Sequence, residues 1–560
     1  MRTGLFGIAA TRRVTLGDNA LCVGRDGFHV ALAMDEPRQA VQKASLHVHA
    51  DCVFGAHGVW LNAKNREWDD LRHRQALASA LSSKDSFAEV EGPLHGVYGN
   101  CLTQTLMLHG DFARQHPLFW TECDWGILFA YSMSKLVSLM GSLNVSALPD
   151  QDGASLLLTY GSILGDGTLI RGVKKLMPGH TLTWTPKGVA VEERLPLREI
   201  SRDVSSLAQS TDLLDDVFLE SVSQMVAVNK HGRFNQYNLL SGGLDSRLVT
   251  MATSRMCDAS TVSTFCFSRR GSLDESISAS LALAHGWRHH CHDLGQGEYM
   301  MHTETVLDYD GCVNYLASAH HRRALVTENL PKMGMLASGQ GANVLLTDKH
   351  RWASNGERVL RSMELYNSIR GVSQDAANQA WQANPGIQRF KLVNRGFLYT
   401  NSGAYSTLPF GVLWSPFTSG QFVRTALRLD SKIVDGQLAY LTWLQKRFPE
   451  ATEHKWERYN TFPVLGRRLR RAQAQALWRA RILRFLPVRD DASMSPIDMW
   501  LDSSEEIQHF YRNTFHQHSS LLQHYPELEE AVARDFSAMN AMNKASVLTL
   551  LLATKAWFDS

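Results

Sequence analysis

The chain has 560 residues, 44% of them hydrophobic and 20% charged, so it can fill more than one hydrophobic core and we expect two domains. Its formal net charge of +2 is too balanced to indicate nucleic acid or an acidic membrane as a main partner. The eight cysteines form no CxxC pair and no apolar run is long enough to span a bilayer, which favours a reducing, cytoplasmic location without a membrane contact.

The first part of the chain, to about residue 195, is rich in predicted strands. The opening segment "MRTGLFGIAATRRVT" is expected to form a first strand, because its apolar part is too short for a signal peptide. The runs "GFHVALAMD", "HGVYGNCLTQTLMLHG" and "WGILFAYS" are typical of strands separated by Gly, Asp and Pro. "HTLTWTPKGVAVEERL" predicts a hairpin whose turn is Pro186-Lys187-Gly188.

The pattern changes after a polar stretch at residues 201–210. From there, helical periodicity alternates with the short apolar runs "QYNLL", "ASTVSTFCF" and "KMGMLAS", which predicts a parallel α/β sheet. Beyond residue 350 the chain is expected to be mostly helical, ending in the amphipathic "AMNKASVLTLLLATKAWF". We therefore expect domains at residues 1–200 and 205–560.

A glycine turn joins a predicted strand to a predicted helix in "YNLLSGGLDSRLVT", residues 237–250. Such a turn presents backbone N–H groups and the positive end of a helix to an anion. Ser241 and Ser246 can donate hydroxyl hydrogen bonds to phosphate, whereas Asp245 would repel a bare phosphate, which predicts an intervening Mg²⁺ ion. The pattern is not a Walker A motif, and the alternative is a tight turn capped by Asp and Ser.

"SGGLDS" resembles the signature of the PP-loop ATP pyrophosphatases, which adenylate a carboxylate with ATP and release pyrophosphate. Nearly the whole chain is similar to their asparagine synthetase-like branch, which includes asparagine, β-lactam and lasso-peptide macrolactam synthetases. "STFCFSRRGSLDESISASLALAHGWRHHCHDL", "LASGQGANVLL" and "WSPFTSGQFVRTALRL" resemble further family stretches in the family's order. The resemblance implies an α/β synthetase domain with a PP-loop, a parallel sheet with helices and a helical C-terminal part, preceded by a β-rich, Ntn-amidotransferase-like α+β domain.

The resemblance also implies an ATP site built on two glycine turns, with Mg²⁺ held by Asp245 and Asn343. It assigns catalytic roles to Asp245 and to the cations Lys455 and Arg458, for which the alternative is a surface position. Phe267, and more weakly Phe265, would lie near the adenine. The full set expected to bind the nucleotide is Leu240, Ser241, Gly242, Gly243, Leu244, Ser246, Phe267, Ser338, Gly339 and Gly341.

Two positions depart from the family pattern. Asn343 stands where relatives carry an aspartate that helps to hold Mg²⁺, and Asp348 could compensate for it. Gln340 stands where some relatives carry a Glu or Tyr that assists deprotonation of the amine, a role that glutamine cannot fill. "RHHCH", residues 288–292, could suggest a metal site, but two adjacent strand histidines face opposite sides and favour a structural role.

The N-terminal half resembles the amidotransferase-type domain that precedes these synthetases. In glutamine-dependent members a cysteine follows the initiator Met and its thiol is the nucleophile. Here that residue is Arg2, and the nearest cysteine is Cys22. We therefore expect no glutamine hydrolysis, so the attacking amine must come from another source.

The resemblance favours a lasso-peptide cyclase, because of Arg247 after "SGGLDS", a basic helix from Gly466 and an apolar C-terminal helix. Such an enzyme adenylates an Asp or Glu side chain of a leader-cleaved precursor peptide, and the peptide's N-terminal amine closes the ring. A leader peptidase is the expected partner, besides the precursor peptide. The alternatives are a glutamine-independent asparagine, amide or β-lactam synthetase acting on a small carboxylate, and a degenerate peptide-binding scaffold. The basic helix itself could be a solvated face or a dock for an acidic peptide or phosphates.

Overall fold

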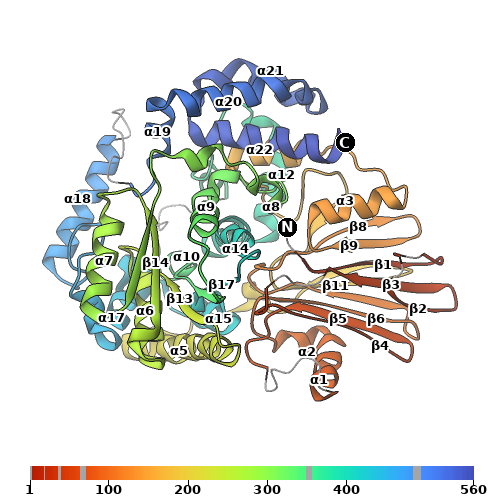
Figure 1. Ribbon diagram of the computed structural model, residues 1–560, viewed down its shortest axis with the longest axis horizontal. Helices are drawn as coiled ribbons and strands as arrows, with labels where there is room; N and C mark the ends of the chain where they lie inside the picture. Colours follow the sequence, from red (N-terminus) through yellow and green to blue (C-terminus); the bar gives the residue numbers. More distant parts are fainter. Residues whose placement is uncertain are drawn as a thin grey trace.

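The computed structural model describes residues 3–14, 16–17, 19–35, 39–63, 71–347, 356–483 and 493–559. Figure 1 shows two halves side by side, a stack of antiparallel sheets formed by the first third of the chain and a larger half in which helices surround a parallel sheet. Asp348 and Arg2 lie outside the described residues.

The N-terminal half contains two six-stranded antiparallel sheets, in the orders β10-β8-β9-β1-β3-β2 and β12-β11-β7-β6-β5-β4. Alternating side chains of both sheets, such as Val30 and Val97, are fully buried in one core between them. The predicted first strand and hairpin are both present. The strands are β1 (Leu5–Ala10), β2 (Leu21–Arg25), β3 (Phe28–Met34), β4 (Lys43–His49), β5 (Cys52–Gly58), β6 (Leu94–Asn100), β7 (Thr105–His109), β8 (Phe119–Cys123), β9 (Gly126–Ala130), β10 (Lys174–Lys175), β11 (His180–Thr185) and β12 (Gly188–Glu193).

Short helices lie on the outer faces of these sheets in Figure 1: α1 (Leu71–Leu81) and α2 (Lys84–Ala88) on one side and α3 (Met133–Ser142) on the other. The helix α4 (Gln151–Tyr160) packs instead against α12 (Arg370–Ala383) and α22 (Ala541–Phe558). Asp150 caps α4 by accepting a hydrogen bond from Gly153 N, and Gly161 ends it in the left-handed region at φ 70°. The end of α4 therefore points to the larger half of the molecule, where Asn314 N donates to Gly161 O.

The larger half is built on a five-stranded parallel sheet in the order β15-β14-β13-β16-β17. The three apolar runs predicted as strands form β13 (Asn235–Leu239), β14 (Val262–Ser268) and β16 (Met333–Ala337), and β15 (Arg288–Asp293) and β17 (Val412–Trp414) complete the sheet. The long helix α5 (Leu207–His231) precedes β13, while α6 (Leu244–Met256) and α7 (Leu273–His285) follow β13 and β14. Because β13 lies at the centre, its carboxyl end is where a ligand site is expected in such a sheet.

The rest of the chain is mostly helical, as predicted. Around the sheet lie α10 (Ala342–Leu345), α13 (Ile387–Lys391), the π-helix Leu392–Thr400, α14 (Ser402–Thr407), α15 (Gly420–Leu427) and α17 (Leu438–Arg447), and α18 (Arg467–Leu483) projects at one end. A cap of α19 (Ile497–Ser503), α20 (Glu505–His518), α21 (Pro526–Asp535) and α22 (Ala541–Phe558) lies along the top in Figure 1. In the described part of the chain, no helix has the length and apolar character needed to cross a membrane.

The two halves share a hydrophobic core and polar contacts. Leu61 and Ala113 of the first half are buried in the same cluster as residues of the parallel-sheet half. The Glu91 carboxylate accepts hydrogen bonds from Gly420 N and Gln421 N at the start of α15, each 3.2 Å long. A helix start in one half is thus capped by an acid of the other. The predicted fold class, a β-rich domain followed by an α/β synthetase-type domain, is confirmed.

Candidate active site

The first glycine turn lies where the sequence predicts it, between β13 and α6. The strand ends at Leu239 and the helix begins at Leu244, with Gly243 as the N-cap residue at φ −74° and ψ 161°. No side chain caps this helix end. The first turn of α6 is therefore open to an anion, which argues against the alternative of a tight turn closed by its own Asp and Ser.

The amides of the turn itself are held by side chains. Ser241 N donates to Ser246 Oγ at 3.1 Å and Gly243 N to Ser241 Oγ at 3.2 Å. Gly242 N donates to Asp274 Oδ1 at 2.9 Å, so this amide is already bonded within the chain and is not open to a phosphate, which the sequence had suggested. The groups available to phosphate are the first turn of α6 and the two serine hydroxyls, which can rotate toward a ligand.

The second glycine turn follows β16 and lies against the first. A Cβ atom at Gly339 would stand 2.4 Å from Ser246 N and 2.6 Å from the carbonyl carbon of Asp245. Only glycine allows this approach. Gly341 takes φ 98° just before α10, again a conformation suited to glycine. The two turns thus meet at the N-terminus of α6.

Asp245 is fixed by two donors from distant parts of the chain. The Tyr440 hydroxyl donates to Asp245 Oδ1 at 2.6 Å, and Asn343 Nδ2 donates to Oδ2 at 2.8 Å. Burial, and then the neighbouring Asp245 charge, raises the pKa of Tyr440 well above its ordinary value, so its hydroxyl stays a donor. The carboxylate is therefore oriented before any ligand arrives.

The donor set fits a Mg²⁺ ion that takes most of its ligands from phosphates and water. Asp245 offers carboxylate oxygens, and the Asn343 amide offers one more oxygen. Within the described residues, no group of three or more His, Cys, Asp or Glu side chains is arranged to hold a metal ion. A metal here would therefore depend on the nucleotide for the rest of its coordination.

A cavity of about 650 Å³ opens over both turns. It brings together most of the residues predicted to bind nucleotide or metal, whereas Gly242 and Lys455 do not line it. The predicted residues in its wall are Leu240, Ser241, Gly243, Leu244, Asp245, Ser246, Phe267, Ser338, Gly339, Gly341, Asn343 and Arg458.

The aromatic end of this cavity carries Phe265 and Phe267 from β14 and His320. The Phe267 ring lies 5.1 Å from that of His320 and stacks at 5.3 Å on that of His321. Burial lowers the pKa of His320 to about 4, so the imidazole is neutral and has one N–H donor and one acceptor. This end is suited to a flat heterocycle, and no sequence pattern had indicated His320.

A family comparison agrees with this geometry. The profile of the asparagine synthase family matches residues 213–543, which is more than half of the chain and includes both glycine turns. The chain belongs to the asparagine synthase family. The match supports ATP binding and ATP-dependent amide bond formation, and no curated protein matches the chain.

In this asparagine synthase-family chain, Arg247 ties α6 to the segment that closes the cavity. Its side chain is fully buried and donates to Gly242 O at 3.1 Å, Ala451 O at 2.7 Å and Lys455 O at 2.9 Å. Burial lowers its pKa to about 10, so it remains charged at neutral pH. Arg247 thus has a structural role: its hydrogen bonds join α6 to the segment at Ala451 and Lys455.

The segment after Lys455 supplies two cavity residues that the sequence did not single out, Trp456 and Glu457. Of the two predicted cations, Lys455 is exposed and does not line the cavity, whereas Arg458 does. Burial, together with the negative charges of Asp274 and Asp245, raises the pKa of Glu457 to about 7. One carboxylate in the wall is therefore partly protonated near neutral pH when no cation is bound.

The N-terminal half offers no thiol at the start of β1. Thr3 Oγ1 lies 3.3 Å from His57 Nε2, and Leu5 N donates to His95 Nε2 at 3.4 Å. Burial lowers the pKa of both histidines, so they are neutral. Cys22 lies exposed on β2, at the edge of its sheet.

The histidines of "RHHCH" have structural partners. His290 and His292 both contact the Glu328 carboxylate, while His289 Nδ1 lies 2.8 Å from Thr264 Oγ1. His289 and His290 therefore point to different sides of β15, as the alternation of a strand predicts. This arrangement agrees with the structural role favoured from the sequence.

Proposed function

We propose that the protein is a lasso-peptide cyclase: it adenylates an Asp or Glu side chain of a leader-cleaved peptide and joins it to the peptide's N-terminal amine. The family match supports ATP-dependent amide formation. The proposal that the substrate is a peptide rests on one observation, which is the size of the space beside the nucleotide cavity. A second cavity of about 420 Å³ shares the wall residues Asn343 and Val344 with it, which leaves room for a substrate much larger than a small amino acid.

In the first step the substrate carboxylate attacks the α-phosphorus of ATP. A bond forms between a carboxylate oxygen and this phosphorus, the bond to the β-phosphate oxygen breaks, and pyrophosphate leaves. The N-terminus of α6, with the hydroxyls of Ser241 and Ser246, would bind the phosphates, and Arg458, which lines the same cavity, would add positive charge. A Mg²⁺ ion held by Asp245 and Asn343 would neutralise developing phosphate charge.

In the second step an amine attacks the acyl carbon, AMP leaves and the amine loses a proton. Positioning supplies much of the rate in such a step, because both reacting groups are held together. Thr3, just before β1, lies against His57 of β5, and no cysteine stands among residues 1–10, so a thiol for glutamine hydrolysis is not found there. An amine on the substrate itself therefore fits better.

The test gives the purified protein ATP, Mg²⁺ and the leader-free form of a precursor peptide encoded near its gene. We expect the peptide to lose one water, with equal amounts of AMP and pyrophosphate released. Asp245→Ala should release no AMP. If the peptide stays unchanged while aspartate and ammonia are converted to the amide, a synthetase for small carboxylates replaces our proposal.

A further inference from the structure

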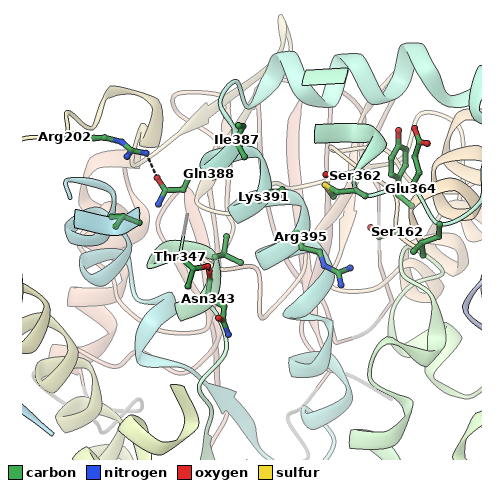
Figure 2. A pocket seen from close by; sticks show the side chains of 15 residues that line it. Ser162, Arg202, Asn343, Thr347, Ser362, Glu364, Ile387, Gln388, Lys391 and Arg395 are labelled. Carbon is green, nitrogen blue, oxygen red and sulfur yellow. Dashed lines mark hydrogen bonds between the residues drawn. The ribbon is translucent and has the colours of Figure 1, made fainter. Parts of the chain in front are cut away.

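The second cavity, drawn in Figure 2 with Asn343 among its labelled lining residues, shares Asn343 and Val344 of α10 with the nucleotide cavity. Its walls include Tyr160 and Ser162, at the end of α4, and residues of α13 and the π-helix. Asn343, which lines both cavities, donates to the Asp245 carboxylate. A substrate lying in the second cavity could therefore reach the activating site past this side chain.

Three cationic side chains line this cavity: Arg202, and Lys391 and Arg395 from α13 and the π-helix that follows it. Among the described residues that line the cavity, Glu364 is the one carboxylate. Figure 2 shows Lys391 and Arg395 on one helical stretch, with the Arg395 guanidinium reaching away from its helix. Cationic side chains therefore outnumber carboxylates among the described lining residues.

The guanidinium groups of Arg202 and Arg395 are held in place by neighbours. The Arg202 guanidinium donates to Gln388 Oε1 at 2.7 Å, and Gln388 Nε2 donates to Leu345 O at 2.9 Å, which links Arg202 to α10. The Arg395 guanidinium lies over the Tyr399 ring at 3.9 Å. Both contacts leave further N–H donors of each guanidinium for a carboxylate.

The same cavity also has an apolar surface. Val344, Met363, Leu365, Ile387 and Val434 contribute to its lining. A simple inorganic anion would gain nothing from these side chains, whereas a peptide with both apolar and acidic side chains would contact both kinds of wall.

We propose that the second cavity binds an anionic peptide segment, with Arg395, Lys391 and Arg202 holding its carboxylates. The inference rests on the proposed function, since it names the substrate class of the same site. It adds a selectivity for negative charge at positions other than the carboxylate that is activated. An acidic side chain and a C-terminal carboxylate offer the same chemistry, so the test separates them.

Binding of fluorescein-labelled synthetic peptides to the full-length protein, measured by anisotropy without ATP, tests this inference. One peptide mixes leucine and glutamate, a second has glutamine in place of every glutamate, and each is made with a free and an amidated C-terminus. We expect the glutamate peptides to bind about tenfold or more tightly than the glutamine peptides, whether or not the C-terminus is amidated. Equal binding of the two peptides with a free C-terminus, lost for both on amidation, would assign the cations to a C-terminal carboxylate and overturn the proposed recognition of acidic side chains.

The variant R395Q/K391Q should lose this preference, whereas R512Q on α20, far from both cavities, should keep it. Binding of a fluorescent ATP analogue should be unchanged in all three proteins, which shows that they fold. Equal affinity of wild type for glutamate and glutamine peptides, or an unaltered preference in R395Q/K391Q, overturns the inference. Charge-selective binding without any AMP formation would instead refute the proposed function and leave the inference standing.

Discussion

At the scale of single residues, the site depends on side chains that meet from distant parts of the sequence. Asp245 lies between the Tyr440 hydroxyl and the Asn343 amide, so both of its oxygens already have donors. This arrangement stabilises a carboxylate in the absence of a metal. It also explains how a neutral residue can stand where relatives of the chain carry a second acid: Asn343 orients Asp245 instead of adding charge.

Asn343→Asp tests this account. The change removes the N–H donor at 2.8 Å from Asp245 and places two carboxylates side by side, so we expect the metal-free protein to lose about 1–3 kcal/mol of stability. Added Mg²⁺ should then raise the melting temperature of the variant more than that of wild type. Asn343→Ala is the control that loses the donor without adding charge. A melting temperature of Asn343→Asp that does not respond to Mg²⁺ would contradict a metal at this position.

Glu457 predicts a pH dependence of stability. Its folded-state pKa of about 7 lies above its ordinary value of 4.5, so the folded protein prefers the protonated form. Protonated Glu457 therefore contributes to the free energy of unfolding. This contribution is complete below pH 4.5, is lost as the pH rises through 7, and amounts to at most about 3 kcal/mol.

Glu457→Gln keeps a neutral side chain at every pH, so its stability relative to wild type should rise between pH 5 and pH 8. Urea unfolding in EDTA at these two pH values measures this difference. The exposed Glu453, in the same segment, provides a control in Glu453→Gln. A Glu457→Gln variant whose stability follows that of wild type at both pH values would show that Glu457 is not perturbed.

At the scale of elements, the helix α6 holds an irregular segment, residues 449–458, in place at the cavity. Arg247 on α6 bonds to carbonyl groups of Ala451, His454 and Lys455, and so fixes the stretch that carries Trp456, Glu457 and Arg458 into the cavity. The sequence predicted both glycine turns, because they depend on local residues. It could not predict these contacts, which join residues about 200 positions apart.

The same limit explains why the sequence did not show which of the two predicted cations, Lys455 or Arg458, faces the cavity. In an irregular segment no periodicity shows which side chains face inward, and Lys455 points to solvent while Arg458 lines the cavity. Tyr440, on α17, gave no sequence signal either, because an aromatic residue in an amphipathic helix looks like any core residue.

Arg247→Gln should loosen this segment. It leaves several carbonyl groups without their donor, so we expect a loss of about 3 kcal/mol or more and faster amide hydrogen exchange over residues 449–458. Arg512→Gln on α20, at an exposed position outside this segment, is the control and should cost under about 1 kcal/mol. If amide hydrogen exchange over residues 449–458 is unchanged in Arg247→Gln, the Arg247 hydrogen bonds are not needed to hold this segment.

At the scale of the whole molecule, the β-rich half is part of the structural frame of the synthetase half. Leu61 and Ala113 pack in the core of the other half, and the Arg114 guanidinium donates to the Tyr405 hydroxyl at 2.6 Å. The sequence predicted both fold types from strand and helix patterns, and the boundaries at residues 200 and 205 stay a prediction. The shared core had no signature in the sequence, because packing between halves depends on tertiary contacts.

We expect the two halves to unfold together. Calorimetry should give one transition whose calorimetric and van't Hoff enthalpies agree. Glu91→Ala, which removes the acceptor for Gly420 N and Gln421 N across the interface, should lower the melting temperature of this single transition rather than split it. Two separate transitions in wild type would show that the halves are independent.

The central claim is that the meeting point of the two glycine turns binds the triphosphate of ATP. A crystal structure of the protein with Mg²⁺ and a non-hydrolysable ATP analogue tests it most directly. Our account predicts phosphate oxygens within hydrogen-bond distance of the first amides of α6 and of the Ser241 and Ser246 hydroxyls, with the base beside Phe267. A triphosphate bound elsewhere, with the hydrogen bond between these two serines and the bond from Ser241 N to Ser246 Oγ unbroken, would contradict it.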